Sequence, residues 1–247
     1  MKKLYEKNEL NFALIWIGLY VVLFSVADNV SVSIGVEKLV TAALGILMTA
    51  ILYLWIAKNG LKIKYGLCKP EGEIKKYLYY IPLILLASTN IWFGFKMNLS
   101  VLETFLGIVS MLCVGFLEEV IFRGFLFKAL CRDNVKLAVI ISSVTFGFGH
   151  IVNLLNGREV PETLMQICYA VAIGFLFTII FYKGKSLWPC IITHSALNSL
   201  SIVANADARS FEINIFISAF LCVASFVYAI HIIKTSENSN NKKETLI

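Results

Sequence analysis

Long apolar runs follow one another along almost the whole chain, separated by short polar segments. A membrane-spanning helix needs about 20 consecutive apolar residues, and eight stretches reach or approach that length. Helices are the expected spanning form, because lipid offers backbone groups no hydrogen-bond partner and the alternating pattern of barrel strands is absent. The pattern therefore predicts an all-α polytopic membrane protein with eight transmembrane helices, at residues 11–27, 36–57, 77–95, 101–130, 135–155, 163–182, 187–204 and 213–233.

The composition of the chain agrees with this fold class. Of its 247 residues, 58% are hydrophobic and 15% are charged, whereas a soluble domain has about 45–50% apolar and about 25% charged residues. The mean hydropathy of the chain is +0.78, which excludes a water-soluble globular fold. The six cysteines are scattered without a CxxC pair, so they favour neither a disulfide framework nor a zinc site.

The positive charges predict the orientation. If both termini are cytoplasmic, 17 of the 22 Lys and Arg residues fall on the cytoplasmic side. Only Lys38, Lys96, Arg158 and Arg209 fall outside, and Arg123 lies within a span. Basic cytoplasmic loops are typical of membrane proteins, so the net charge of +6 reflects topology. We expect a multi-pass protein of the cell membrane whose partners are membrane lipids, with no nucleic acid.

The chain has no visible internal repeat, which predicts a single domain at residues 1–233. The first apolar run is longer than a usual signal peptide, so we expect it to be an uncleaved helix. Residues 234–247 are rich in Asn, Ser, Lys and Glu, a composition that predicts a disordered cytoplasmic tail.

Ionisable residues inside the predicted spans are the candidates for function. A charge near the bilayer centre costs about 2.5–3.5 kcal/mol, so Glu118, Glu119, His150 and His194 each need a partner, water or a chemical role. Glu119 and Arg123 stand at i and i+4, the acid-to-base order that favours an ion pair on one helix. This pairing leaves Glu118 to face a cavity.

Depth in the membrane suggests which groups meet. With a rise of about 1.5 Å per residue, Glu118, His150 and Asn198 lie roughly 18–21 Å from the cytoplasmic ends of their helices. His194 is one turn closer to the cytoplasm and shares a helix face with Asn198. These groups are therefore predicted to line one cavity. Small residues that permit close helix approach stand near them: Gly115, Gly147 and Gly149.

Such a set of side chains can hydrolyse a peptide bond. A carboxylate beside an imidazole can hold and deprotonate water, and an amide with a second imidazole can stabilise the oxyanion. Alternatively, Glu118, His150 and His194 can bind a divalent metal such as zinc and leave a position open for water. The zincin motif HExxH is absent, and the residues alone leave both options open.

Three motifs in order resemble the CPBP family of intramembrane proteases (Abi, or type II CAAX prenyl endopeptidases). EExxxR stands at residues 118–123, FxxxH at 146–150 and HxxxN at 194–198, within a motif core of residues 101–204. The resemblance implies that Glu118 and His150 activate the attacking water. It also implies that His194 and Asn198 form the oxyanion site and that Glu119 and Arg123 support Glu118.

The resemblance implies an intramembrane endopeptidase that cleaves a membrane-associated protein or peptide. Members of the family are described either as glutamate-dependent enzymes or as metalloproteases, so a zinc cofactor stays open. Eukaryotic relatives process prenylated CaaX proteins, and bacterial relatives are linked to peptide maturation, bacteriocin immunity or peptide signalling. Two alternatives remain: a non-catalytic membrane immunity or binding protein of the same fold, and a small transporter in which Glu and His form a relay.

Overall fold

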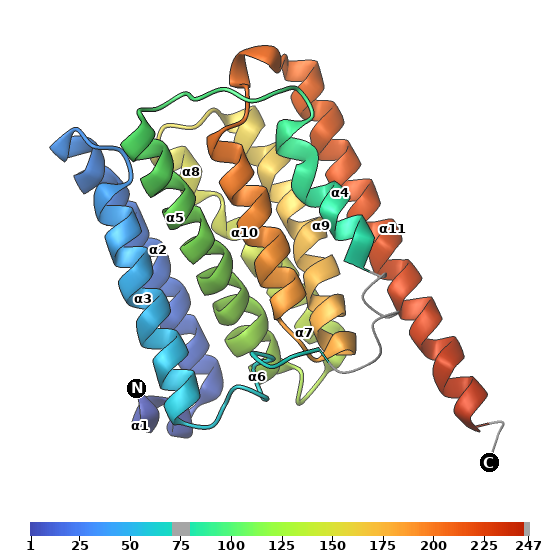
Figure 1. Cartoon of the computed structure of the whole chain (residues 1–247). Coiled ribbons are helices and arrows are strands. Elements are labelled where there is room, and N and C mark those ends of the chain that lie inside the picture. Colours follow the sequence, from blue (N-terminus) through green and yellow to red (C-terminus); the bar gives the residue numbers. More distant parts are fainter. Residues whose placement is uncertain (71–79, 245–247) are drawn as a thin grey trace.

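The computed structural model describes residues 1–70 and 80–244, and these residues form a helical bundle without a named strand (Figure 1). The all-α polytopic class predicted from the sequence is confirmed. The helices are α1 (Lys2–Lys7), α2 (Glu9–Ile34), α3 (Leu39–Lys58), α4 (Ile81–Ser88) with a 3-10 turn η2 (Thr89–Ile91), α5 (Val101–Glu118), a π-helix η3 (Glu119–Phe127), α6 (Lys128–Leu130), α7 (Val135–Gly149), α8 (Val152–Leu155), α9 (Val160–Gly184), α10 (Trp188–Ile202), a 3-10 turn η4 (Ala206–Ala208) and α11 (Phe211–Glu244).

Six helical segments of the described chain are long and apolar enough to cross a membrane: Glu9–Ile34, Leu39–Lys58, Val101–Leu130, Val135–Leu155, Val160–Gly184 and Phe211–Thr235. The other two predicted spans are helical but shorter. The helix at Ile81–Ile91 is apolar, and residues 77–79 of its predicted span lie outside the described residues. Because α10 has 15 residues, it reaches about 22 Å at 1.5 Å per residue. The total of eight spans stays a prediction.

Polar side chains shorten the segment that begins with α4. The Ser88 hydroxyl donates to the Leu85 carbonyl at 2.9 Å, and the Thr89 hydroxyl donates to the Leu86 carbonyl at 3.0 Å. Such side-chain bonds compete with the helical ladder. The helix accordingly tightens into the 3-10 turn at Thr89 and ends at Ile91.

The loops alternate between the two ends of the bundle, as the charge pattern predicts. At one end, Glu9 accepts hydrogen bonds from Lys64 and Arg132, both at 2.7 Å. At the other end, the Glu37 backbone N–H donates to Glu103 at 3.0 Å. The N-terminus and the last described turn of α11 lie at the end that carries Glu9 (Figure 1). That this end is cytoplasmic stays a prediction.

Glycines let the helices that carry the candidate residues touch. A Cβ on Gly115 would lie 2.7 Å from the Ser195 backbone nitrogen, so α5 and α10 meet there. A Cβ on Gly147 would lie 2.9 Å from the Val171 nitrogen, so α7 and α9 are equally close. Gly149 has open space around its Cβ position. Two of the three predicted glycines therefore serve close packing.

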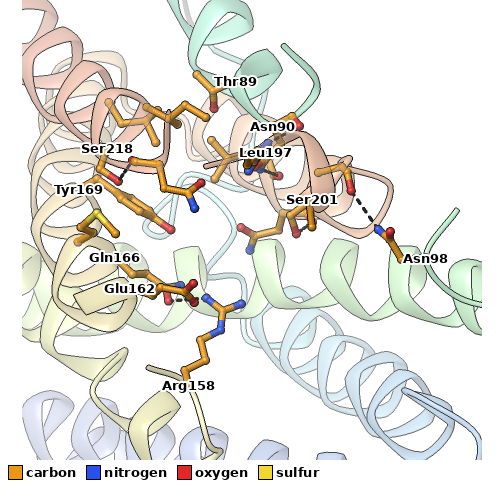
Figure 2. Close-up of a pocket in the computed structure, with 18 residues that line it drawn as sticks. Thr89, Asn90, Asn98, Arg158, Glu162, Gln166, Tyr169, Leu197, Ser201 and Ser218 are labelled. Atoms are coloured by element: carbon orange, nitrogen blue, oxygen red, sulfur yellow. Dashed lines mark hydrogen bonds between the residues drawn. The ribbon is translucent and has the colours of Figure 1, made fainter. Parts of the chain in front are cut away.

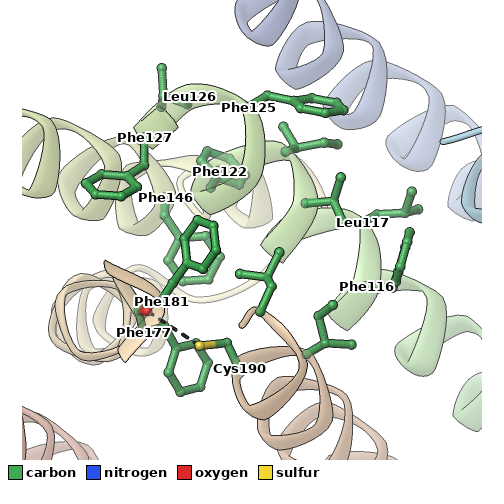
Figure 3. Close-up of a cluster of buried hydrophobic side chains, with 14 of the residues drawn as sticks. Phe116, Leu117, Phe122, Phe125, Leu126, Phe127, Phe146, Phe177, Phe181 and Cys190 are labelled. Carbon is green, nitrogen blue, oxygen red and sulfur yellow. Dashed lines mark hydrogen bonds between the residues drawn. The ribbon is translucent and has the colours of Figure 1, made fainter. Parts of the chain in front are cut away.

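The second part of the longest buried segment, residues 114–127, is a π-helix. All nine residues of Glu119–Phe127 are buried. Phe122 of η3 packs against Phe146 of α7, and Phe127 packs against Phe181 of α9 (Figure 3). The sequence analysis assumed a uniform α-helix here, and that assumption is wrong. The two glutamates stand where α5 ends and the π-helix begins. π-helical turns are rare and often occur at functional sites.

The last helix, α11, packs along α9. It continues to Glu244, into the polar segment that the sequence predicts to be disordered, and residues 245–247 lie outside the described residues. The limits of the single domain and the disorder of the tail stay predictions.

Candidate active site

The ion pair predicted between Glu119 and Arg123 is present. Arg123 Nη1 lies 3.0 Å from Glu119 Oε1, and neither side chain is exposed. The guanidinium sits over the ring of Phe146, 4.1 Å from its centroid. Gly174 makes room for it, because a Cβ there would lie 3.1 Å from Arg123 Nη2. A buried charge needs such compensation, so this pair belongs to the packed interior.

His194 contacts both glutamates. Its Nδ1 lies 2.8 Å from Glu119 Oε1, and its Nε2 lies 3.4 Å from Glu118 Oε2. Because Glu119 Oε1 also accepts from Arg123, Nδ1 acts as a donor to it. The sequence places His194 beside Asn198 on one helix face but gives no sign of this contact with Glu119. Its imidazole therefore lies between the two neighbouring carboxylates and hydrogen-bonds to that of Glu119.

Tyr20 supplies a contact to Glu118 that the sequence analysis missed. The phenol of Tyr20, from the middle of α2, donates to Glu118 Oε1 at 2.7 Å. Glu118 is 8% exposed, and its Oε2 has no hydrogen-bond partner within the described protein. The first oxygen is therefore fixed by the protein, and the second is buried beside His194 Nε2. A phenol inside an apolar span was the available signal.

His150 lies at the end of α7, where Gln166 of α9 contacts its ring. Gln166 Oε1 accepts from Asn153 at 2.8 Å and from Arg158 at 3.1 Å. Its Nε2 therefore faces His150 Nδ1, at 3.3 Å, as a donor. A neutral His150 with an acceptor at Nδ1 carries its proton on Nε2. Gln166 is a second residue that the sequence analysis missed, although a carboxamide within a span was a usable signal.

One cavity collects the predicted residues of three helices. A cavity of about 280 Å³ is lined by Glu118, His150 and Asn198, together with Tyr20 and Gln166. A smaller one of about 50 Å³ is lined by His150, His194 and Asn198. Together, the two cavities are thus lined by the carboxylate of Glu118, the imidazoles of His150 and His194 and the amide of Asn198. Glu118, His150 and Asn198 share one cavity, as their predicted depth requires.

The predicted metal ligands were tested against the same geometry. Within the residues that the structure describes, no group of three or more His, Cys, Asp or Glu side chains is arranged so that it could hold a metal ion. Both nitrogens of His194 face carboxylates. The arrangement of Glu118, His150 and His194 therefore does not fit a metal centre, and we derive no step through one.

Fold and site together define a polytopic helical membrane protein with a buried cavity of acid, imidazole and amide groups. Residues 100–200 match the sequence model of the family described as "Type II CAAX prenyl endopeptidase Rce1-like". This segment holds all three motifs, so the resemblance to the CPBP family is confirmed.

A similar protein in Bacillus subtilis (strain 168) is named "Putative membrane peptidase YdiL". It is 32% identical over 101 residues, which cover 40% of this chain and 37% of the relative. The similarity therefore spans little more than a third of that protein. No solved structure matches the chain.

Proposed function

We propose that the protein is an intramembrane endopeptidase of the cell membrane that hydrolyses a peptide bond in a membrane-associated protein or peptide. The observation that carries the proposal is the position of Glu118. One of its oxygens accepts from Tyr20, and its side chain lines a polar cavity together with His150 and Asn198. The family match and the printed name of the relative support the same class of reaction.

Glu118 is the general base in this proposal. Its carboxylate accepts a proton from water, and the water oxygen attacks the carbonyl carbon of the scissile bond. The proton on Glu118 then passes to the leaving amine as the C–N bond breaks, which returns the carboxylate. General acid–base catalysis of this kind contributes about 10²–10⁴-fold in rate. Burial inside the membrane also keeps competing water away from the reacting atoms.

The oxyanion is assigned to His150 and Asn198. The Gln166 contact leaves an Nε2–H on neutral His150, and the Asn198 amide lines the same cavity. Donors fixed before the reaction stabilise developing charge most effectively. This assignment differs from the family-based expectation that pairs His194 with Asn198. The change rests on the two contacts of His194 with Glu118 and Glu119, which suit a positioning role.

The test compares full-length wild type with Glu118→Gln and His150→Ala in proteoliposomes. A library of membrane-anchored peptides is added, and cleavage products are identified by mass spectrometry. We expect Glu118→Gln to lower the rate at least about 10²-fold and His150→Ala to lower it strongly, with both proteins folded. Glu6→Gln is the matched control, because Glu6 is exposed at the far end of the bundle. Cleavage that persists in Glu118→Gln contradicts the general-base assignment.

The proposal assigns a glutamate-type rather than a zinc-type reaction. The expected result is full cleavage after treatment with a chelator, in protein that elemental analysis finds free of zinc. Activity that is lost on chelation and restored by added zinc would instead make Glu118, His150 and His194 the ligands to examine. A protein that is folded yet cleaves no library member in the wild-type form would favour the non-catalytic binding protein.

A further inference from the structure

A second, larger cavity adjoins the catalytic one. It has a volume of about 490 Å³ and lies between α9, α10 and α11, within the size range of ligand sites. Arg158, Gln166, Asn198 and Ser201 line both cavities. Figure 2 shows Arg158, Glu162 and Gln166 on one side of it and Asn90 and Ser201 on another. A group bound here would therefore lie directly beside the reacting bond.

The cations at this end of the bundle divide into two kinds. Lys38 forms an ion pair with Asp28 at 2.8 Å, and Lys96 forms one with Asp207. Arg158 and Arg209 are the other two basic residues at this end. Neither makes an ion pair within the described part of the chain, and both line the larger cavity.

Arg209 is anchored but keeps a free donor. Its Nη2 donates to the Asn90 carbonyl and, at 3.2 Å, to the Asn90 side-chain oxygen. Its Nε is buried and has no hydrogen-bond partner among the described residues. Burial lowers the pKa of the Arg209 guanidinium, although arginine stays charged in proteins. A half-buried cation with an unused donor is a binding group for an anion.

Arg158 connects the larger cavity to the catalytic residues. Its Nη1 donates to Gln166 at 3.1 Å, and Gln166 in turn donates to His150. Among the described lining residues, the cavity has two positively charged groups, the guanidiniums of Arg158 and Arg209. It has one negatively charged group, the carboxylate of the exposed Glu162. The remaining polar lining consists mostly of amides and hydroxyls, which suit the peptide backbone.

We propose that this cavity is a substrate subsite that binds a carboxylate through Arg158 and Arg209. Guanidinium groups recognise carboxylates through paired, charge-assisted hydrogen bonds. The carboxylate can come from an acidic side chain near the cleaved bond or from the C-terminus of the peptide. The proposal rests on the proposed function, since it names the substrate group that the same site accepts.

The test measures binding without cleavage, in full-length Glu118→Gln protein in detergent micelles. Three dansylated tripeptides serve as probes: one with a free C-terminal carboxylate and neutral side chains, its C-terminal amide, and an amide with one glutamate side chain. We expect at least one carboxylate probe to bind about tenfold or more tightly than the neutral amide. The stronger of the two identifies the source of the carboxylate.

Variants then test the two arginines. Adding Arg158→Gln or Arg209→Gln should remove most of the preference for a carboxylate, whereas Arg132→Gln, at the opposite end, should leave it unchanged. Glu162→Gln should strengthen carboxylate binding slightly, because a like charge is removed. Where Arg209→Gln fails to fold, Arg209→Lys and Arg158→Gln carry the test, since Arg158 is exposed and its loss leaves the Arg209 anchor intact.

Equal binding of amide and carboxylate probes, or a preference that survives Arg158→Gln combined with the Arg209 variant, would overturn the subsite. Failure of the proposed function gives a different result. In that case wild-type protein cleaves no peptide, while the carboxylate preference and its dependence on the arginines remain.

Discussion

Glu118 and Glu119 are neighbours in the sequence but lie in two different regions of the molecule. Glu119 is fully buried beside Arg123 and His194, near the aromatic rings that surround the guanidinium. Glu118 touches Tyr20 and faces a polar cavity. We call the surroundings of Glu119 the closed region, because an ion pair neutralises its charge there. The surroundings of Glu118 are the open region, because its carboxylate borders a cavity. The carboxylate that we propose to be reactive thus stands next to a second carboxylate that is buried in an ion pair.

The strongest test of this difference is to replace each glutamate by glutamine and compare the two variants. Glu119→Gln leaves Arg123 buried without its carboxylate, and losing one partner of a buried pair costs about 3–5 kcal/mol. Glu118→Gln keeps an oxygen for the Tyr20 hydroxyl and should leave stability nearly unchanged while it abolishes cleavage. Thermal unfolding in micelles, followed by near-UV circular dichroism, measures the difference. Equal loss of stability in both variants would contradict the division into closed and open regions.

The glycine contacts offer the next largest effect. Gly147→Ala places a Cβ 2.9 Å from the backbone nitrogen of Val171 and 3.0 Å from the carbonyl of Ile167, so α7 and α9 must separate. Overpacking of this kind costs about 1–3 kcal/mol, and it also displaces His150 at the end of α7. We expect lower stability and lower activity together.

Gly149→Ala is the matched control, because the same methyl group meets open space two residues further along. Its stability should stay within about 0.5 kcal/mol of wild type. A similar loss in both glycine variants would mean that helix propensity, and not the contact between α7 and α9, sets the effect.

The sequence predicted the helices and the convergence of Glu118, His150 and Asn198, because hydropathy and helical rise are regular properties of a chain. The Glu119–Arg123 pair followed from spacing for the same reason. The π-helix could not be predicted, since its composition matches that of an apolar α-helix. That His194 contacts both carboxylates depends on how α5 and α10 cross, and the periodicity of the sequence does not report that crossing angle.

Tyr20 and Gln166 were missed for a different physical reason. The sequence search looked for ionisable groups, whose burial costs several kcal/mol and therefore demands an explanation. A phenol or a carboxamide is neutral, so its presence in a span is less conspicuous. Both nevertheless hydrogen-bond to predicted residues, namely Glu118 and His150. Neutral polar residues at the depth of an intramembrane acid are thus worth including in such a search.

Gln166→Leu sharpens the description of the open region. Loss of the donor to His150 Nδ1 frees the ring to adopt either tautomer, and we expect kcat to fall about tenfold with a smaller change in KM. The nitrogen-15 chemical shifts of the His150 ring provide a direct readout, which a purely structural role of Gln166 would leave unchanged. An unaltered tautomer in Gln166→Leu would contradict the positioning role.

Tyr20→Phe should have the smallest effect. A hydrogen bond to a charged group contributes about 1.5–3 kcal/mol, but Glu118 borders a polar cavity where water can replace the phenol. The carboxylate keeps its charge and loses part of its fixed orientation, so kcat should fall only a few-fold with stability retained. Tyr53→Phe, at the far end beside Lys62, is the control and should leave kcat unchanged. A loss as large as that of Glu118→Gln would show that Tyr20 takes part in proton transfer itself, and the open region would then contain two reactive groups.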